Sequence, residues 1–197
     1  MKIKGNVLVY LILILGSVSL LFVGCQSEPT KKEMSQQEMI ERGKFLVTVG
    51  GCDDCHTPKN FGPNGPEFDM SRRLSGHPAG SVIAPVDTSL LHQYAYFSHD
   101  LTTAIGPWGV TFSANLTPDN ETGIGTWQPE MFVNAMKTGK HLGVAEGRPI
   151  LPPMPWQNMA QLPEEDLKCI FAYLKSLPAV KNKVPEPMAP YQIPVVN

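Results

Sequence analysis

The sequence has little charge and no excess of either sign. Only 17% of its 197 residues are charged, and 16 basic against 18 acidic side chains give a formal net charge of −2. A protein that binds nucleic acid through the phosphates needs a basic excess, so we expect no nucleic-acid partner. The 19 prolines indicate a fold rich in loops rather than a bundle of long helices.

Long hydrophobic runs are missing after the first two dozen residues. Two lysines precede an apolar run from Val7 to Val23, an order typical of an export signal. Residues 22–25, Phe-Val-Gly-Cys, resemble the lipobox of bacterial lipoproteins, which predicts a signal peptide over 1–24 and lipid attachment at Cys25. An uncleaved membrane helix is the alternative, with a run near the lower length limit for a span. Both interpretations leave the protein exported and tied to the outer side of the cytoplasmic membrane, on its periplasmic face.

The rest of the chain divides into three predicted parts. Residues 25–35 are polar and are expected to form a tether between the lipid and the domain. The domain itself is predicted over 36–180. The proline-rich stretch 181–197 is expected to be an extended C-terminal arm.

Cysteine is scarce, and its spacing is the main clue to the chemistry. Apart from Cys25, the chain has Cys52 and Cys55, two residues apart, and an isolated Cys169. A structural zinc site usually needs a second such pair, which is missing. A thioredoxin-like dithiol needs a strand–helix context that the surrounding sequence lacks. A plain disulfide suits an exported protein but leaves the adjacent His56 unexplained, and Cys169 is interpreted as a small apolar core residue.

The segment 52–56, C-D-D-C-H, has the pattern of covalent haem attachment. The two thiols add to the vinyl groups of a haem, and the adjacent histidine is positioned to bind the iron. We therefore expect one covalent haem c, held by Cys52, Cys55 and His56.

Helix signals occur in three segments: 36–49, 129–139 and 163–177. Ser35 and Glu38 predict a capping box before the first, a proline starts the second, and acidic residues open the third, which carries an apolar stripe at helical spacing. No strand pattern and no internal repeat is evident, and 60–114 is expected to be rich in loops. Because such short helices are unstable alone, the haem is expected to complete the apolar core.

The second axial position of the iron decides the function, because an open position lets the iron bind or activate a small molecule. Met154, in the segment L-P-P-M-P-W, is the predicted ligand. Its neighbouring prolines restrict the backbone, so a weakly held thioether loses little entropy on binding. Packing of Met154 against Trp156 is the structural alternative. The remaining histidines are expected to be solvated, although a His/His haem through one of them stays open; they are His77, His92, His99 and His141.

These motifs resemble those of class I-type cytochromes c, and more narrowly the haem domains of cytochrome subunits of bacterial membrane dehydrogenases for alcohols and related substrates. The segments that carry the resemblance are GKFLVTVGGCDDCHTP, ANLTPDNETGIGTW, PEMFVNAMKTG, PPMPW and EEDLKCIFAYLKSLP. The resemblance implies an all-α cytochrome c fold with a long loop-rich insertion at 60–114. It also implies that the first and last helices cross at Gly43, with His56 and Met154 as axial ligands.

The sequence thus predicts a membrane-tethered cytochrome c that is an electron carrier rather than an enzyme and moves one electron at a time. Its expected partners are redox proteins, either a membrane dehydrogenase or a terminal oxidase. A haem subunit inside a larger dehydrogenase or oxidase complex is an alternative that shares this mechanism and differs only in its partners. A five-coordinate haem protein that senses a gas or reduces peroxide is a second alternative, and it requires Met154 to be unbound. His56 is expected to donate its other ring N–H to a backbone carbonyl between Pro63 and Leu74.

Overall fold

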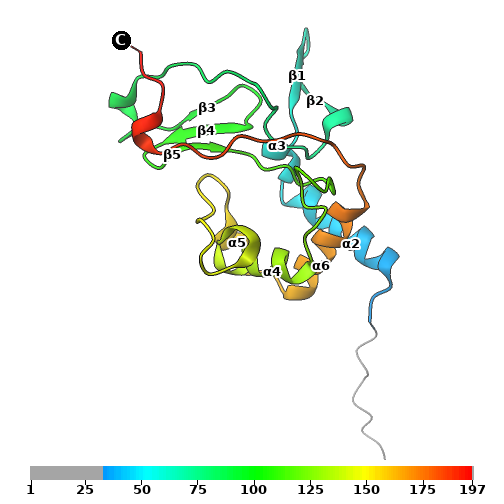
Figure 1. Ribbon diagram of the computed structural model, residues 1–197. Helices are drawn as coiled ribbons and strands as arrows, with labels where there is room; N and C mark the ends of the chain where they lie inside the picture. Colours follow the sequence, from blue (N-terminus) through cyan, green and yellow to red (C-terminus); the bar gives the residue numbers. More distant parts are fainter. Residues whose placement is uncertain (1–32, 197) are drawn as a thin grey trace, which may run out of the picture. The chain divides into compact units, whose positions relative to one another are not determined.

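The computed structural model describes residues 33–196, of which those from Met34 onward form one unit. Within this unit the larger helices lie on one side and a three-stranded sheet on the other (Figure 1). None of the helices in the described part has the length and apolar character that a membrane span requires. The predicted signal peptide over 1–24 and the lipid-attachment site at Cys25 lie outside the described residues.

Helix α2 (Gln36–Val49) has the bounds that the sequence predicted. The capping box is formed: the Ser35 hydroxyl accepts a hydrogen bond from the Glu38 backbone N–H, and the Glu38 carboxylate accepts one from the Ser35 backbone N–H. The short helix α3 (Cys52–His56) follows Gly51, whose φ of 62° lies in the left-handed region that favours glycine. This turn separates the haem-attachment motif from the end of α2.

Helices α2 and α6 (Glu164–Ser176) cross in direct contact at Gly43. A Cβ atom at this position would lie 1.9 Å from the carbonyl oxygen of Cys169 and 2.7 Å from the Cβ of Tyr173. Only glycine allows the two backbones to approach this closely, so the crossing at Gly43 that the resemblance implied is confirmed. Cys169 is fully buried at this contact, as the sequence predicted.

Helices α4 (Pro129–Thr138) and α5 (Trp156–Met159) complete the helical side. Helix α4 starts at a proline and ends at Gly139, whose φ of 66° closes the last turn, as predicted. Apolar residues of α2, α4 and α6 form the first core, which includes Val47, Phe132, Val133, Met136, Leu167, Ile170, Phe171 and Leu174.

The expectation of an all-α fold is wrong, because the segment between α3 and α4 contains strands. An exposed hairpin pairs β1 (Lys59–Gly62) with β2 (Gly65–Phe68), and an antiparallel sheet joins β3 (Tyr96–Phe97), β4 (Thr103–Gly106) and β5 (Gly109–Phe112). All four residues of β4 are buried, so this strand lacks the polar–apolar alternation by which a half-buried strand is recognised.

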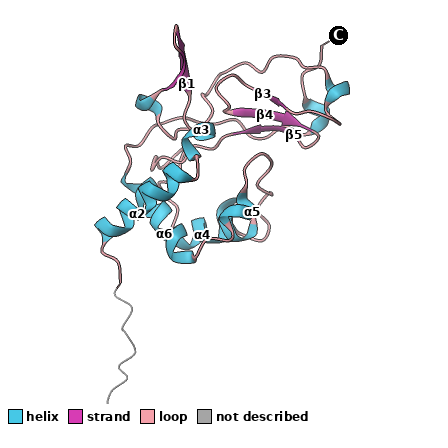
Figure 2. Ribbon diagram, turned by 180° about the vertical axis from the view of Figure 1, so that it is seen from behind, coloured by secondary structure: helices cyan, strands magenta, loops and turns pink. Residues whose placement is uncertain are grey.

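The C-terminal segment lies along β5 rather than apart from the domain. Val110 and Met188 exchange two backbone hydrogen bonds, of 2.9 and 3.0 Å. Residues 86–112, which include strands β3–β5, and residues 181–196 together form what we call the sheet lobe (Figure 2). The lobe has a second apolar core, made of Leu91, Ile105, Val110, Phe112 and Ile193.

Candidate haem-binding site

A cavity of about 550 Å³ is lined by residues of both the helical side and the sheet lobe. Phe132, Ile170 and Leu174 of the first core form part of its wall, and Phe112 and Val184 of the sheet lobe form another part. A volume of this size is typical of pockets that bind a cofactor. The insertion and the C-terminal segment therefore form part of the cavity wall.

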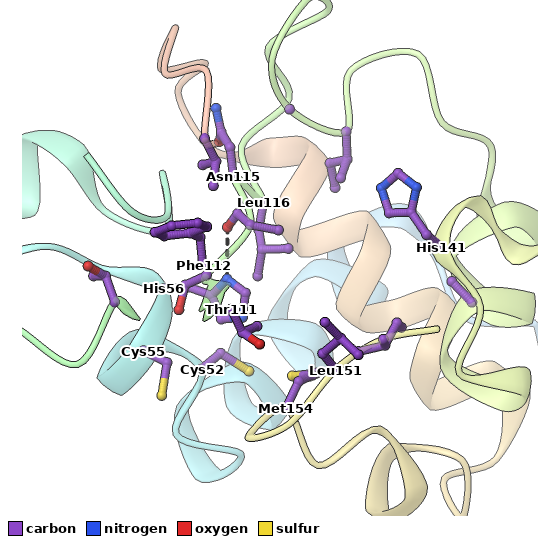
Figure 3. Close-up of a pocket in the computed structure, with 18 of the residues that line it drawn as sticks. Cys52, Cys55, His56, Thr111, Phe112, Asn115, Leu116, His141, Leu151 and Met154 are labelled. Atoms are coloured by element: carbon purple, nitrogen blue, oxygen red, sulfur yellow. Dashed lines mark hydrogen bonds between the residues drawn. The ribbon is translucent and has the colours of Figure 1, made fainter. Parts of the chain in front are cut away.

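All four predicted haem-binding residues line this cavity. Cys52, Cys55 and His56 come from α3, and Met154 comes from the loop before α5, as Figure 3 shows. Two thiols suit the vinyl groups of a haem, and an imidazole and a thioether suit the two axial positions of its iron. The donor set and the apolar wall therefore fit haem c.

The three cysteines of the described part are free thiols. Burial and, secondly, the negative charge of Asp53 raise the pKa of Cys52 to about 11. Burial also raises the pKa of Cys55. A thiol-redox centre needs the opposite, a cysteine whose pKa is lowered. Burial lowers the pKa of His56, which favours the neutral imidazole that binds iron.

The ring of His56 is fixed by Ala114. Its Nδ1 lies 2.8 Å from the carbonyl oxygen of Ala114. When Nδ1 donates this bond, Nε2 is left to bind a metal. The expectation that the carbonyl would lie between Pro63 and Leu74 is wrong.

Residues 74–77 explain why the carbonyl comes from Ala114 and not from residues 63–74. They lie between α3 and the segment that carries Ala114 and bind both. The Gly76 backbone N–H donates to the carbonyl of His56 at 2.8 Å, and the Leu116 backbone N–H donates to the carbonyl of Leu74 at 2.9 Å. A backbone carbonyl has no residue signature, so the sequence offered no signal for Ala114. Residues 74–77 themselves had one signal, the glycine at position 76.

Gly76→Ala is expected to displace the Ala114 carbonyl from His56. Gly76 has a φ of 79°, and an added Cβ would lie 2.3 Å from the Ser113 carbonyl oxygen and 2.6 Å from that of Ala114. A weaker hydrogen bond makes the imidazole a less basic ligand, so the midpoint potential of the haem-loaded protein should rise. Gly80→Ala is the matched control, because Gly80 has the same φ of 79° and nothing within 4 Å. An equal shift in both variants would contradict the prediction.

Met154 lies in a loop that is held at both ends. The Ile150 backbone N–H donates to the Gly139 carbonyl at 2.8 Å, and the Trp156 backbone N–H donates to the Met154 carbonyl at 2.9 Å. The Trp156 ring lies against Gly139, where a Cβ would come within 2.4 Å of it. The loop is therefore ordered by contacts with the end of α4, in addition to the restriction from its prolines.

The expectation that the other histidines are solvated is wrong for His77, whereas His141 is half-buried. His77 is only 5% exposed, with its Nδ1 2.9 Å from the hydroxyls of Thr102 and Thr103. His141 lines the cavity with its ring edge-on to Trp127, at a centroid distance of 5.8 Å. Among the described residues it is thus the one histidine besides His56 on the cavity wall. His92 and His99 are exposed, as predicted.

Comparison with known proteins gives several relatives, although no protein-family model matches the chain. A nicotinate dehydrogenase subunit of Pseudomonas putida is 29% identical over 147 residues, which cover 75% of this chain and 9% of the relative. The fructose dehydrogenase cytochrome subunit of Gluconobacter japonicus is 27% identical over 169 residues, covering 83% and 27%. A diheme cytochrome c-type protein of Cereibacter sphaeroides is 29% identical over 173 residues, covering 86% and 45%.

The chain therefore spans less than half the length of each of these relatives. The sequence identity is modest, but the similarity extends over most of this chain. Further relatives are the cytochrome c subunits of gluconate 2-dehydrogenase and of alcohol dehydrogenase (quinone). The homologues of this protein thus include cytochrome c subunits of several dehydrogenases, as the motifs around the cavity led us to expect.

Proposed function

We propose that this protein is an electron carrier that holds one haem c in the cavity and passes single electrons between redox proteins. One observation carries the proposal: Cys52, Cys55, His56 and Met154 line the same apolar cavity although the last lies on a separate loop. When bound, the haem supplies a one-electron couple at its iron. The names of the homologues support the same function.

Each side chain has a distinct role in this proposal. Cys52 and Cys55 would hold the haem covalently, and His56 and Met154 would both bind its iron. The iron would then be closed to small molecules and would only exchange electrons. A methionine ligand favours the ferrous state relative to a second histidine, which raises the potential.

The walls of the cavity also favour a high reduction potential of the haem. Apolar side chains from the helical side and from the sheet lobe surround the site. A low local dielectric disfavours the additional positive charge of ferric iron, so burial also raises the potential. No nucleophile and no general base is required of this chain.

The spectrum of the reduced protein tests the proposal. The full chain, matured with haem-attachment machinery, should give a c-type spectrum on reduction, and CO at neutral pH should leave it unchanged. Rapid CO binding by the wild-type protein would overturn the proposal in favour of a five-coordinate haem that senses a gas or reduces peroxide. Absence of a c-type spectrum would overturn both.

We propose further that the protein works on the outer side of the cytoplasmic membrane, held there by lipid on Cys25, with a dehydrogenase or terminal oxidase as partner. The support for the anchor is the apolar run 7–23 followed by the lipobox-like residues 22–25. The support for a dehydrogenase partner is that the homologues include subunits of dehydrogenases.

Cys25→Ser is expected to abolish lipid attachment, because the serine hydroxyl replaces the thiol that would be acylated. Cells fed a labelled fatty acid should incorporate label into the wild-type protein and not into this variant. Cys169→Ser serves as the control and should remain labelled, since Cys169 is buried in the fold. Equal labelling of wild type and Cys25→Ser would contradict the anchor.

A further inference from the structure

Asp53 lies between the two haem-attachment cysteines, yet its side chain binds elsewhere. Its carboxylate forms a bidentate ion pair with Arg73, at 2.9 Å from Nε to Oδ1 and 2.7 Å from Nη2 to Oδ2. The two side chains are only 17% and 22% exposed. Two parallel hydrogen bonds fix the relative geometry of the partners as well as pairing their charges.

The ion pair is part of a connected set of hydrogen bonds. The Thr57 hydroxyl donates to Asp53 at 2.7 Å and accepts from the Leu74 backbone N–H at 2.9 Å. Arg73 also donates from Nη1 to the Tyr173 hydroxyl at 2.5 Å. Tyr173 belongs to α6 and lies at its crossing with α2. Arg73 therefore connects the haem-attachment helix to the main helical crossing.

We propose that the Asp53–Arg73 ion pair is a positioning device for the haem-attachment helix and that its two charges offset one another beside the iron. The inference rests on the proposed function, because it concerns the potential of a haem bound to α3. Neither side chain lines the cavity, so both act through α3 and through the field that they generate.

The charges of Asp53 and Arg73 affect the potential because Asp53 lies near His56. Asp53 precedes His56 by three positions on α3, and side chains three apart on a helix are neighbours. A negative charge near the iron stabilises the ferric state, and a positive charge stabilises the ferrous state. Because the pair is largely shielded from water, each charge is felt more strongly than at the surface. The net effect of the intact pair is small, since the two signs oppose.

Both partners are charged at neutral pH. Burial alone would raise the pKa of Asp53, but hydrogen bonds from Arg73 and Thr57 hold it below its ordinary value. The same hydrogen bond raises the pKa of Arg73. Neutralising one partner therefore leaves the other as a poorly solvated charge near the haem.

The test is the midpoint potential of the full, haem-loaded chain in four forms. Asp53→Asn should shift the potential upward, Arg73→Gln should shift it downward, and the double variant should lie close to wild type. A purely structural link would behave differently, because loosening α3 from either side would shift the potential in one direction and the double variant would not recover. Shifts of the same sign, or no shift in either single variant, would overturn the proposal.

Arg73→Lys separates charge from geometry. Lysine keeps the positive charge but lacks the bidentate fork, so the potential should stay near that of wild type while the urea midpoint of unfolding falls. A shift as large as that of Arg73→Gln would overturn the proposal. If Asp53→Asn or Arg73→Gln accumulates without haem, the potential and the urea midpoint of Arg73→Lys still test the proposal.

The Arg42–Asp166 pair provides a matched control. It has the same bidentate geometry, at 2.8 and 2.9 Å, and it joins α2 to α6, with neither side chain on the cavity wall or on α3. Asp166→Asn should lower the urea midpoint without shifting the potential. Failure of the inference is distinct from failure of the proposed function, since the latter shows as a wild-type protein without a c-type spectrum.

Discussion

Gly43→Ala is expected to lower the free energy of unfolding by about 3 kcal/mol, the upper end of the usual range for inserting a methyl into a packed site. The new Cβ would lie 1.9 Å from the Cys169 carbonyl oxygen, and a backbone atom in a helix cannot turn aside as a flexible side chain can. At an unhindered position inside a helix the same substitution stabilises by about 1 kcal/mol. The crossing of α2 and α6 therefore makes this substitution destabilising, although elsewhere in a helix it would stabilise the protein.

Urea unfolding followed by circular dichroism measures this effect. Gly62→Ala is the control, because nothing lies within 4 Å of the position that its Cβ would take. It should change the free energy of unfolding by less than about 1 kcal/mol. A Gly43→Ala protein as stable as wild type would show that the two helices do not meet as closely as described.

Met154→Ala is expected to open the iron. In the ferrous variant CO should bind at neutral pH, and the midpoint potential should fall, because water or a nitrogen ligand in place of the thioether favours ferric iron. The absorption spectrum under CO and a redox titration measure the two effects. The change in CO binding should be qualitative, from none to one CO per haem.

Met159→Ala is the matched control for this experiment. Met159 also lines the cavity and is partly buried against the same core, but it follows Met154 by five residues, at the end of α5. Its removal should leave the iron closed. CO binding by Met159→Ala with none by Met154→Ala would exchange the roles of the two methionines and contradict the assignment.

Local signals explain why the helices could be predicted from the sequence. The capping box at Ser35 and Glu38, the proline that starts α4 and the glycine that ends it each act within a few residues. The segment C-D-D-C-H is also a local signal, because the adjacent histidine favours haem attachment over zinc, a redox dithiol or a plain disulfide. Met154 could be singled out because its neighbouring prolines predict an ordered loop, and the structure adds contacts that hold that loop at the end of α4.

Long-range pairing explains what the sequence did not reveal. The strands have at most four residues, and β4 is buried at every position, so neither length nor alternation marks them. The Ala114 carbonyl reaches His56 across 58 positions. His77 is buried by hydroxyls 25 and 26 residues away, at Thr102 and Thr103. Each of these features depends on a partner that no local pattern identifies.

The sheet lobe is a larger feature that local sequence patterns also do not reveal. The insertion and the C-terminal segment each lack a periodic pattern, but together they form one apolar core through Val110, Ile193 and Met188. Neither could form that core alone. Their joint position against the cavity is what gives this protein a second apolar wall around the proposed haem.

The mass of the denatured full chain, matured with haem-attachment machinery, tests the central claim most directly. Covalently bound haem remains with a denatured chain, so wild type should carry the mass of one haem, and Cys52→Ser/Cys55→Ser should carry none. Cys169→Ser should match wild type apart from the substitution, because Cys169 lies in the core away from the cavity. A wild-type chain that loses all its haem on denaturation, or that carries two, would contradict the account.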